Sequence, residues 1–573
     1  MSTTNALDTA FNLNQKVLHQ LRSGYYPDSK DGLLNEIKSF FCPETHSSAP
    51  IFNPPLYFAQ LDAEVVRLRR NARALTAPIR RLPVDILYEI FSYCARIAHR
   101  LLGQREDYVL SIRGSSHRPR CPTLELTWMC SHWRFIIRDY PPLWSSFYIE
   151  ADLDRISFPR RFEVFREYMA LSRQSPLKFC IVIPLESTAV ALHDYRILVD
   201  NLDRWQHVIL DSTTLIGLDS MIPTGHCPNL QSLWIIKQHR HDSQPPPSCV
   251  LSSAPSLRTY RDTGTVAWSK STWFDCSHLT SLNIHVLRAK SIAHFLARFP
   301  NLKEFSLGEF EGDGSLITSV LVYQCKIAIL NLSMKCLLPR IWERLRLPHL
   351  VSLSLYTYAS SYQIWKPEYD SFLKEFSSLL LASQCSLQTL KLYNIPTKHS
   401  LTFISHHPSI TDFVFSSDSI GPDVECSVID LLDALTIEEH RTSRRKKHHP
   451  KPVFLPNFQS FSVNVQTQCL CLPSRIGARA EPSSFITASI LCRMVESRTA
   501  SLTAQPEHAR VPRLQSLTLG LGSWIDQVGR RFIRERMGLH VAVRDEDIEE
   551  SAFGNKCTIP VILSAIIYHL LNF

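Results

Sequence analysis

The chain is poor in glycine: only 17 of its 573 residues are Gly, against 35 Pro. Loops that cradle phosphate groups need several glycines at fixed spacing, and the sequence contains no P-loop motif. The stretch GLGS at 520–523 lacks the third glycine of a dinucleotide-binding loop. The scarcity of glycine therefore argues against a nucleotide-binding enzyme, and the many prolines indicate numerous short elements with defined ends.

Motifs for metal binding and hydrolysis are also missing. The sequence has no HExxH, no GxSxG and no Asp-rich calcium loop. The segment CLC at 469–471 has no second cysteine pair at zinc-finger spacing. The adjacent histidines at 406–407 and 448–449 would point in different directions on a helix or strand. We therefore expect no enzymatic activity, no cofactor and no metal.

Long apolar segments and a signal peptide are lacking too. The first residues, MSTTNALDTAFNLNQ, show no basic region followed by an apolar run. The most apolar segment, IPVILSAIIYHLLNF at 559–573, is short for a membrane-spanning helix, so a buried terminal helix or cap is favoured over an anchor. We interpret the 16 scattered cysteines as small core residues, typical of a reducing compartment. The sequence thus predicts a protein of the cytoplasm or the nucleus.

Positive charge is present in excess and is unevenly distributed. The formal net charge is +9, and residues 67–120 hold 12 Arg, no Lys and four acidic residues. A second basic run lies in an insertion at 438–452, which is either a solvated loop or a nuclear import signal formed by Arg444, Arg445, Lys446 and Lys447. Charge that is localised in this way indicates a basic face and a basic loop rather than a surface dedicated to nucleic acid.

The first 80 residues divide into two parts. Residues 1–55 lack sustained periodicity and include a Pro- and Ser-rich stretch, so we expect them to be loosely ordered. Apolar residues then recur every three or four positions from Leu61 to Leu75, which predicts an amphipathic helix over 56–78. Two heptads are too few to establish a coiled coil, so a helix that packs on its own domain is the favoured interpretation.

A helical region with a broad apolar face follows at 79–150. In RRLPVDILYEIFSYC (80–94), Pro83 suits a first helical turn and Asp85 favours the positive helix end. The apolar residues that follow are more numerous than a small three-helix unit is expected to bury, so part of this face is available to a partner. The alternative is that all of them are core residues. The segment 95–123 is polar, basic and rich in turn residues, which predicts an inserted loop.

The rest of the chain carries a recurring pattern, Leu-x-x-Leu-x-Leu. Copies include CPNLQSLWI (227–235), CSHLTSLNI (276–284), FPNLKEFSL (299–307), LPHLVSLSL (347–355), QCSLQTLKL (384–392) and VPRLQSLTL (511–519). Four copies have their first apolar residue at positions 230, 257, 279 and 302, a spacing typical of leucine-rich repeats. The segment CKIAILNLS (325–333) fits as a copy missing between 302 and 350.

In this pattern alternate leucines lie on one face of a short strand, and helix-like segments separate the copies. A chain of this length exceeds one compact core, which suits an elongated array. We therefore predict an irregular α/β solenoid over 151–558, because the consensus Asn after the last leucine is absent. The alternative is an ordinary α/β domain in which the leucine spacing is coincidental.

Together, these parts resemble the F-box proteins with leucine-rich repeats that are abundant in mushroom-forming fungi. The F-box resemblance covers 82–147, and the repeat resemblance extends more loosely over 176–521. The helix at 61–75 and the segment DRWQHVIL (203–210) also resemble these relatives. The residues that carry the motif are Leu82, Pro83, Asp85, Ile86, Leu87, Ile90 and Phe91 in its first half and Cys130, Trp133, Pro142, Leu143 and Trp144 in its second.

The resemblance implies a small helical F-box domain that docks on the Skp-type adaptor of a cullin–RING (SCF-type) ubiquitin ligase, while the repeats hold a protein substrate. The chain would place that substrate near a ubiquitin-charged enzyme and carry out no chemistry itself. The implied adaptor contacts are Leu82, Pro83, Ile86, Leu87, Ile90 and Phe91, and the implied structural residues are Cys130, Trp133 and Trp144.

One departure from the family pattern is the segment 95–123, which makes the region 82–147 longer than is usual for an F-box and puts adaptor binding in question. We expect no small-molecule substrate, no membrane and no nucleic acid as partner. The alternative function is a repeat scaffold that is not coupled to ubiquitin, nuclear or associated with nucleic acid.

Overall fold

The structure, a computed structural model, describes two compact units, one up to Leu230 and one from Gln231 onward. This division lies well after the boundary at 150 that the sequence predicts. The described residues are 3–23, 32–41, 55–75, 82–101, 104–112, 120–150, 158–182, 196–219, 227–237, 254–267, 277–312, 322–336, 344–357, 367–395, 397–417, 430–436, 459–465, 514–521 and 541–543, with short pieces at 342, 455, 457, 490–491, 493–495 and 497–498.

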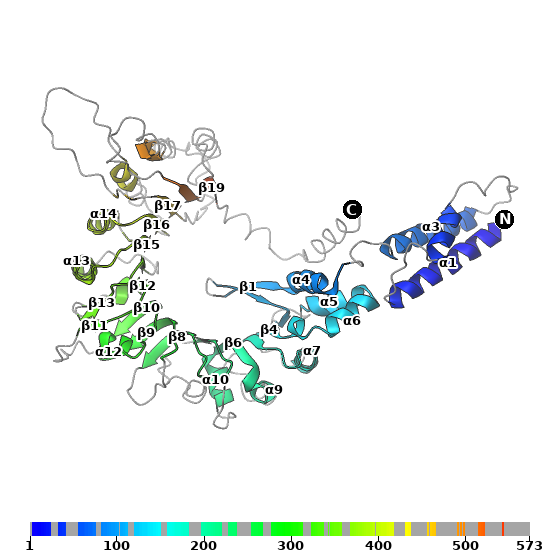
Figure 1. Cartoon of the computed structure of the whole chain (residues 1–573), viewed down its shortest axis with the longest axis horizontal. Coiled ribbons are helices and arrows are strands. Elements are labelled where there is room, and N and C mark those ends of the chain that lie inside the picture. Colours follow the sequence, from blue (N-terminus) through cyan, green and yellow to red (C-terminus); the bar gives the residue numbers. More distant parts are fainter. Residues whose placement is uncertain are drawn as a thin grey trace, which may run out of the picture. The chain divides into compact units, whose positions relative to one another are not determined.

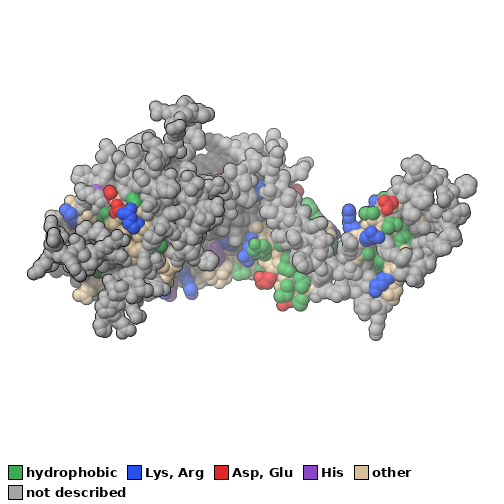
Figure 2. Space-filling view, turned by 90° about the horizontal axis from the view of Figure 1, so that it is seen from above, with side chains coloured by type: hydrophobic (Ala, Val, Ile, Leu, Met, Phe, Trp, Pro, Cys, Tyr) green, Lys and Arg blue, Asp and Glu red, His purple; other side chains and the backbone are tan. Residues whose placement is uncertain are grey.

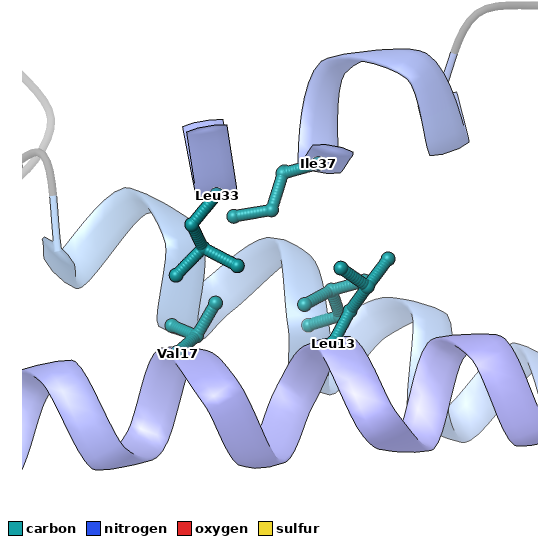
Figure 3. Close-up of a cluster of buried hydrophobic side chains, with 5 residues drawn as sticks. Leu13, Val17, Leu33 and Ile37 are labelled. Atoms are coloured by element: carbon teal, nitrogen blue, oxygen red, sulfur yellow. The ribbon is translucent and has the colours of Figure 1, made fainter. Parts of the chain in front are cut away.

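Three helices open the first unit: α1 (Thr3–Ser23), α2 (Gly32–Phe41) and α3 (Pro55–Leu75) (Figure 1). The expectation of loose order is therefore wrong for the residues in α1 and α2. The helices form because each buries a few apolar side chains in a common cluster, which Figure 3 shows for four of them. Its buried members are Leu13, Val17, Leu33, Ile37 and Leu68.

A buried polar contact fixes α1 against α3. Asn14 of α1 is buried, and its side-chain amide donates a hydrogen bond of 3.1 Å to the carboxylate of Glu64. The amide of Asn71 donates in turn to the Asn14 side-chain oxygen at 2.5 Å. A buried asparagine of this kind specifies the register of two packed helices. The amphipathic helix predicted from residue 56 is confirmed as far as Leu75, and it packs on helices of its own chain.

The next helices are α4 (Val84–Ala95), α5 (Pro122–Met129) and α6 (Ser131–Arg138), followed by the 3₁₀ turn η3 (Pro141–Trp144). The segment between α4 and α5 is not a plain loop, which corrects the prediction for 95–123. It contains an antiparallel hairpin of β1 (Ile97–Leu101) and β2 (Gln104–Tyr108), and then β3 (Leu110–Ile112). Tyr108 and Leu110 are buried, so this segment contributes to the core.

A parallel sheet completes the first unit. Its strands β3, β4 (Ser146–Glu150), β5 (Leu177–Val182) and β6 (Trp205–Asp211) pair in that order. Segments that contain α7 (Phe158–Leu171) and then α9 (Arg196–Val199) with the 3₁₀ turn η5 (Leu202–Arg204) connect the later strands, and α10 (Ser212–Asp219) follows β6. Connections of this length are what parallel pairing requires.

Two tryptophans occupy equivalent places in this unit. The indole nitrogen of Trp144 donates to the carbonyl of Ile137 at 2.8 Å, and that of Trp205 donates to the carbonyl of Leu198 at 3.0 Å. In each case the acceptor lies seven residues earlier and belongs to the preceding helix, and the strand begins within two residues of the tryptophan. Residues 137–150 and 198–211 therefore repeat one unit of helix, 3₁₀ turn, tryptophan and strand.

The second unit is a larger open parallel sheet (Figure 1). Its paired strands, in sheet order, are β7 (Ser232–Ile236), β8 (Thr259–Ala267), β9 (Ser281–Arg288), β10 (Glu304–Glu311), β12 (Ile329–Ser333), β14 (Ser352–Tyr356), β15 (Thr389–Tyr393), β16 (Asp412–Ser417), β17 (Ser460–Val465), β18 (Ser516–Leu521) and β19 (Val541–Val543). A separate parallel pair is formed by β11 (Tyr323–Gln324) and β13 (Leu345–Arg346).

The leucine pattern accounts for these strands. In LPHLVSLSL, Leu350 precedes the strand and Leu353 and Leu355 lie on it, and all three are fully buried. Helices α12 (Ile292–Leu296), α13 (Pro367–Ser383) and α14 (Thr397–Ser405) supply further buried residues, as does the 3₁₀ turn η6 (Met334–Cys336). The segment 325–333, expected as a missing copy, provides β12. The predicted α/β class is therefore confirmed, and the structure shows that the strands form a parallel sheet.

The regular pattern is interrupted at β8. Asp262 is buried at a position that neighbours Ile235 and Ile284 in register. Its carboxylate accepts hydrogen bonds from the Tyr260 hydroxyl at 3.1 Å and the Gly264 amide at 2.8 Å, and it lies 3.7 Å from the Lys237 ammonium. Burial raises its pKa, while Lys237 and the hydrogen bonds oppose that shift. These contacts coincide with a β-bulge between Asp262 and Thr265.

Two sequence-based expectations fall on residues outside the described ranges: the basic insertion at 438–452 and the apolar segment at 559–573. Among the helices that the structure does describe, none is both long enough and apolar enough to cross a bilayer.

A buried histidine lies between two helices of the second unit. The Nε2 atom of His407, which follows α14, is 3.2 Å from the hydroxyl of Ser377 on α13, and its ring packs on Phe403. Burial, assisted by His406, lowers the pKa of His407 to about 4 from an ordinary value of 6.5. The neutral ring is therefore the form that the fold accepts.

We expect His407 to make the second unit sensitive to acid. Its stabilising effect is complete above pH 6.5 and is lost as the pH falls from 6.5 towards 4, because the unfolded chain binds the proton first. The loss amounts to about 2 kcal/mol by pH 5. Thermal unfolding at pH 7 and pH 5 measures it: the melting temperature should fall further in the wild type than in His407→Gln, which carries no titratable group there. Equal decreases would contradict this assignment.

Candidate protein-interaction surface

One face of helix α4 packs in the core, with a buried residue at every fourth position. The helix begins directly after Pro83, whose carbonyl accepts the amide of Leu87 at 3.1 Å. Leu87, Phe91 and Ala95 then lie one turn apart and are fully buried. They hold α4 against α5 and α6, which α4 contacts directly. This face is the one that the local hydrophobic core requires.

The Cys-x-x-Trp pair explains how α6 meets α4. The sulfur of Cys130 caps α6, accepting the backbone amide of Trp133 at 3.4 Å. This cap starts the helix so that the Trp133 ring, which is buried, packs on Phe91 with ring centroids 4.8 Å apart. The structure thus places Cys130 and Trp133 within the packing of these helices, in agreement with the structural role expected of them.

Trp144 joins the same helices to the sheet. Its ring is fully buried, and it donates to the carbonyl of Ile137 at the end of α6. It also packs edge-on against Tyr168 of α7, with centroids 4.9 Å apart. The hydroxyl of Thr123 on α5 donates to the carbonyl of Leu143 at 3.2 Å. Residues of η3 therefore contact α5, α6 and α7, which supports the structural role expected for Trp144.

A second apolar face of α4 points away from this core. We call it the outer stripe, and it consists of Leu82, Ile86, Ile90 and Tyr93, spaced by four, four and three residues. Ile86 is 44% exposed and Tyr93 is 77% exposed, while Leu82 and Ile90 are half-buried. Pro83, beside the stripe, is exposed. Residues at such spacing share one side of a helix.

The neighbouring helices expose further large apolar side chains. Trp128 at the end of α5 is 70% exposed, Met129 is 50% exposed, and Phe135 of α6 is 72% exposed. Figure 2 shows hydrophobic side chains gathered on the part of the molecule that contains α4, α5 and α6. Isolated exposed apolar residues are ordinary, but several large ones on three packed helices make this region the candidate interaction surface of the first unit.

The structure corrects two of the six predicted partner contacts. Leu87 and Phe91 are fully buried, so they cannot contact a partner while α4 keeps its place. The sequence predicts one broad apolar face on α4, but the structure divides it into two adjacent faces. One face packs in the core, and the other is exposed to solvent. Leu82, Pro83, Ile86 and Ile90 remain as surface candidates. The predicted import-signal residues Arg444, Arg445, Lys446 and Lys447 lie outside the described residues.

Sequence reasoning missed four exposed residues: Tyr93, Trp128, Met129 and Phe135. Tyr93 follows Ile86 by seven positions, so helical spacing alone was sufficient to include it. Met129 is half exposed, although it lies directly before the motif residue Cys130. The exposure of Trp128 and Phe135 depends on how α5 and α6 pack, and no local pattern indicates it.

A stacked pair of tyrosines closes one edge of α4. The rings of Tyr88 and Tyr140 are nearly parallel, at 11°, with centroids 3.9 Å apart. Burial, with further effects of Asp139 and Tyr140, raises the pKa of Tyr88. The Tyr88 phenol therefore stays neutral at physiological pH, and the pair links α4 to the turn after α6.

The reactivity of the cysteines bears on what this region can do chemically. Burial raises the pKa of Cys94 on α4, and burial together with Glu125 raises that of Cys121 to about 12. Such thiols stay protonated near neutral pH and are poor nucleophiles. Among the described residues there is also no group of three His, Cys, Asp or Glu side chains placed to hold a metal ion.

In comparisons with known proteins, no family model matches this sequence and no curated protein does. The assignment of the surface therefore depends on its geometry and on the F-box resemblance of its motif residues.

The two faces of α4 should respond differently to truncation. Phe91→Ala removes a buried ring and is expected to lower the free energy of unfolding by about 3 to 5 kcal/mol. Tyr93→Ala, two positions further on, removes an exposed ring and should change it by about 0.5 kcal/mol or less. Urea unfolding of the full chain measures both. A destabilisation by Tyr93→Ala as large as that by Phe91→Ala would show that Tyr93 belongs to the core.

Proposed function

We propose that this protein is an F-box protein with leucine-rich repeats, and that it acts as the substrate-receptor subunit of an SCF-type ubiquitin ligase. In this proposal α4, α5 and α6 bind the Skp-type adaptor, and through it the cullin, while the sheet of the second unit holds a protein substrate. The observation that carries the proposal is the outer stripe of α4. It coincides with the F-box motif residues Leu82, Ile86 and Ile90, and Ile86 and Tyr93 on it are exposed while the adjacent face of the helix is buried in the core.

The energetics of the surface favour a partner. Burial of a large apolar side chain stabilises by about 1.5 to 3 kcal/mol. Ile86, Tyr93, Trp128 and Phe135 together would then contribute several kcal/mol in a complex, enough to offset the lower estimates of the cost of association, about 4 kcal/mol. Buried aromatic residues are also the usual anchors of protein interfaces.

The long segment between the two halves of the motif leaves their packing intact. The Phe91–Trp133 contact joins α4 to α6 across the inserted residues, and the Tyr88–Tyr140 stack joins α4 to the turn that follows α6. The insertion is closed at its base, since the amides of Ser111 and Arg120 each donate to the other's carbonyl, at 3.0 and 2.9 Å. The departure from the usual F-box length therefore gives no reason to reject adaptor binding.

The sheet of the second unit suits the receptor part of the proposal. Its strands are parallel and follow the leucine pattern, with the leucines buried on one side. The other side carries polar residues in register, and the Asn331 amide donates to the Ser306 hydroxyl at 2.9 Å on neighbouring strands. We expect the receptor to contribute by holding a substrate in position, which raises its effective concentration near the ubiquitin-charged enzyme.

The test is direct binding of the purified full chain to a recombinant fungal Skp-type adaptor. Ile86→Ala/Tyr93→Ala should weaken binding by about tenfold or more, because both side chains lie on the outer stripe and such anchors each cost more than about 1 kcal/mol when truncated. Isothermal titration calorimetry or biolayer interferometry would give the dissociation constant.

The control is Lys303→Ala, which truncates an exposed side chain of the second unit, away from the outer stripe in the sequence. This variant should bind as the wild type does. If the wild-type chain fails to bind the adaptor, the ligase function is refuted, and the chain is then better described as a repeat scaffold without coupling to ubiquitin.

A further inference from the structure

The strands of the second unit begin along one common edge, which backbone hydrogen bonds hold in place. Before each of β8, β9, β10, β12 and β14, which are neighbours in the sheet, a buried Leu or Ile lies two positions ahead of the strand. The next two amides then donate to the preceding strand, as those of Lys303 and Glu304 do to the carbonyl of Thr280, at 2.8 and 3.0 Å. Because paired strands lie about 4.8 Å apart, the five strand starts are spaced regularly over about 19 Å.

Each of these five strands is preceded by one Arg, Lys or His residue on this edge. The residue lies either one or three positions before the strand, on either side of the buried Leu or Ile. All five are exposed. We call these residues the basic edge: Arg258, His278, Lys303, Lys326 and His349.

The charges of the basic edge are not paired within the fold. None of its five side chains forms an ion pair with another residue that the structure describes. From three positions before each strand to its first residue, the five segments contain one acidic residue, Glu304, whose carboxylate accepts the Ser281 hydroxyl at 3.1 Å. At the opposite ends of the same strands the charges are paired, since Arg288 of β9 lies 2.6 Å from Glu311 of β10.

Two exposed apolar residues interrupt this polar edge. The first residues of the paired strands β7 to β18 stand in one register row, and every one except Ile329 is Ser, Thr, Asp or Glu. Ile329 is 41% exposed, and Val351, directly before β14, is 38% exposed. The Val351 amide donates to the carbonyl of Ala328, the residue before Ile329, at 2.9 Å. The two apolar residues therefore lie on neighbouring strands, beside the cation of Lys326.

We infer that this edge binds a protein segment that carries acidic residues on both sides of an apolar side chain. The carboxylates would pair with the basic edge, and the apolar side chain would cover Ile329 and Val351. An apolar centre with a charged rim is the general anatomy of a protein interface. The identification of this segment as part of the ligase substrate rests on the proposed function, whereas its chemistry follows from the edge alone.

The same residues favour a protein segment over nucleic acid. Affinity for nucleic acid comes mainly from a row of phosphate contacts, and single strands also stack their bases on aromatic rings. The five segments contain no Phe, Tyr or Trp, and they hold only three Arg or Lys residues. Ile329 and Val351 would have no counterpart on a phosphate backbone, but a peptide can place an aliphatic side chain between two carboxylates.

The test uses a fluorescein-labelled peptide with several Asp and Glu residues on each side of a central pair of leucines. One comparison peptide has Asn and Gln in place of the acidic residues, another has Ser in place of the leucines, and a single-stranded DNA carries the same charge. Fluorescence anisotropy with the full chain gives each dissociation constant at about 50 mM and about 500 mM salt, between which exposed charges become largely screened.

Two variants separate the parts of the edge. The charge variant is Arg258→Gln/Lys326→Asn, and the apolar variant is Ile329→Ser/Val351→Gln. Each new residue is a type that other strands of this sheet carry at the same position, so melting temperatures should match the wild type. The control, Lys290→Gln/Lys374→Gln, removes two exposed charges of the second unit that lie outside the basic edge.

The charge variant should bind the acidic peptide about three- to tenfold more weakly at low salt, with a smaller difference at high salt. The apolar variant should bind it about fivefold more weakly at both salt concentrations, yet bind the serine peptide as the wild type does. The control should match the wild type with every peptide.

Equal binding of the acidic peptide by the wild type and either edge variant would overturn the inference, as would equal binding of the acidic and uncharged peptides by the wild type. Tighter binding of the DNA than of the peptide, lost in the charge variant, would assign the edge to nucleic acid and also overturn it. Both edge variants should still bind the Skp-type adaptor. If the wild type fails to bind the adaptor but the peptide results hold, only the ligase function is refuted.

Discussion

The arrangement of the first unit depends on one buried hydrogen bond, from the indole of Trp144 to the carbonyl of Ile137 at 2.8 Å. The Ile137 carbonyl lies at the end of α6 and also accepts the backbone amide of Tyr140 at 3.2 Å, so the indole adds a second donor at this helix end and pairs its own buried N–H. The same ring fills the space beside Tyr168, which orients α6 relative to the start of β4. Because the sheet holds these helices in place, the outer stripe of α4 does not have to turn inward to stabilise the fold.

The same device appears again at Trp205, whose indole bonds to the carbonyl of Leu198. The second half of the F-box-like motif and the first repeat-like strands are therefore built from one unit, used twice. This explains why the compact unit extends to Leu230 instead of ending with the helices near residue 150. The boundary predicted at residue 150 was placed where the sequence motif changes. It would separate β4 from β5, yet these strands share a core, since Phe147 of β4 stacks on Phe179 of β5 with centroids 5.3 Å apart.

Hydrophobic periodicity predicted the elements that bury a repeating face of their own. It failed for elements whose stability depends on a residue far away in the chain. The leucine strands and α3 could be found because each buries a repeating face. Helix α1 was missed, since its buried Asn14 is satisfied by Glu64 and Asn71, which lie 50 and 57 residues later. Asp262 is tolerated in the core through Lys237, which follows the neighbouring strand β7. Spacing located the apolar side of α4, but it could not separate core from surface, because Leu87 and Ile86 are sequence neighbours that face different surroundings.

The surface around α4 exposes large apolar side chains that the first unit leaves in contact with solvent, namely Ile86, Tyr93, Trp128 and Phe135. Burial of apolar area responds little to moderate salt, because it does not depend on attraction between charges. In the proposed complex, differences in affinity would therefore appear mainly in the dissociation rate. The segment between α4 and α5 is closed at its base by the mutual hydrogen bonds of Ser111 and Arg120, so it lengthens the motif without separating the helices that carry this surface.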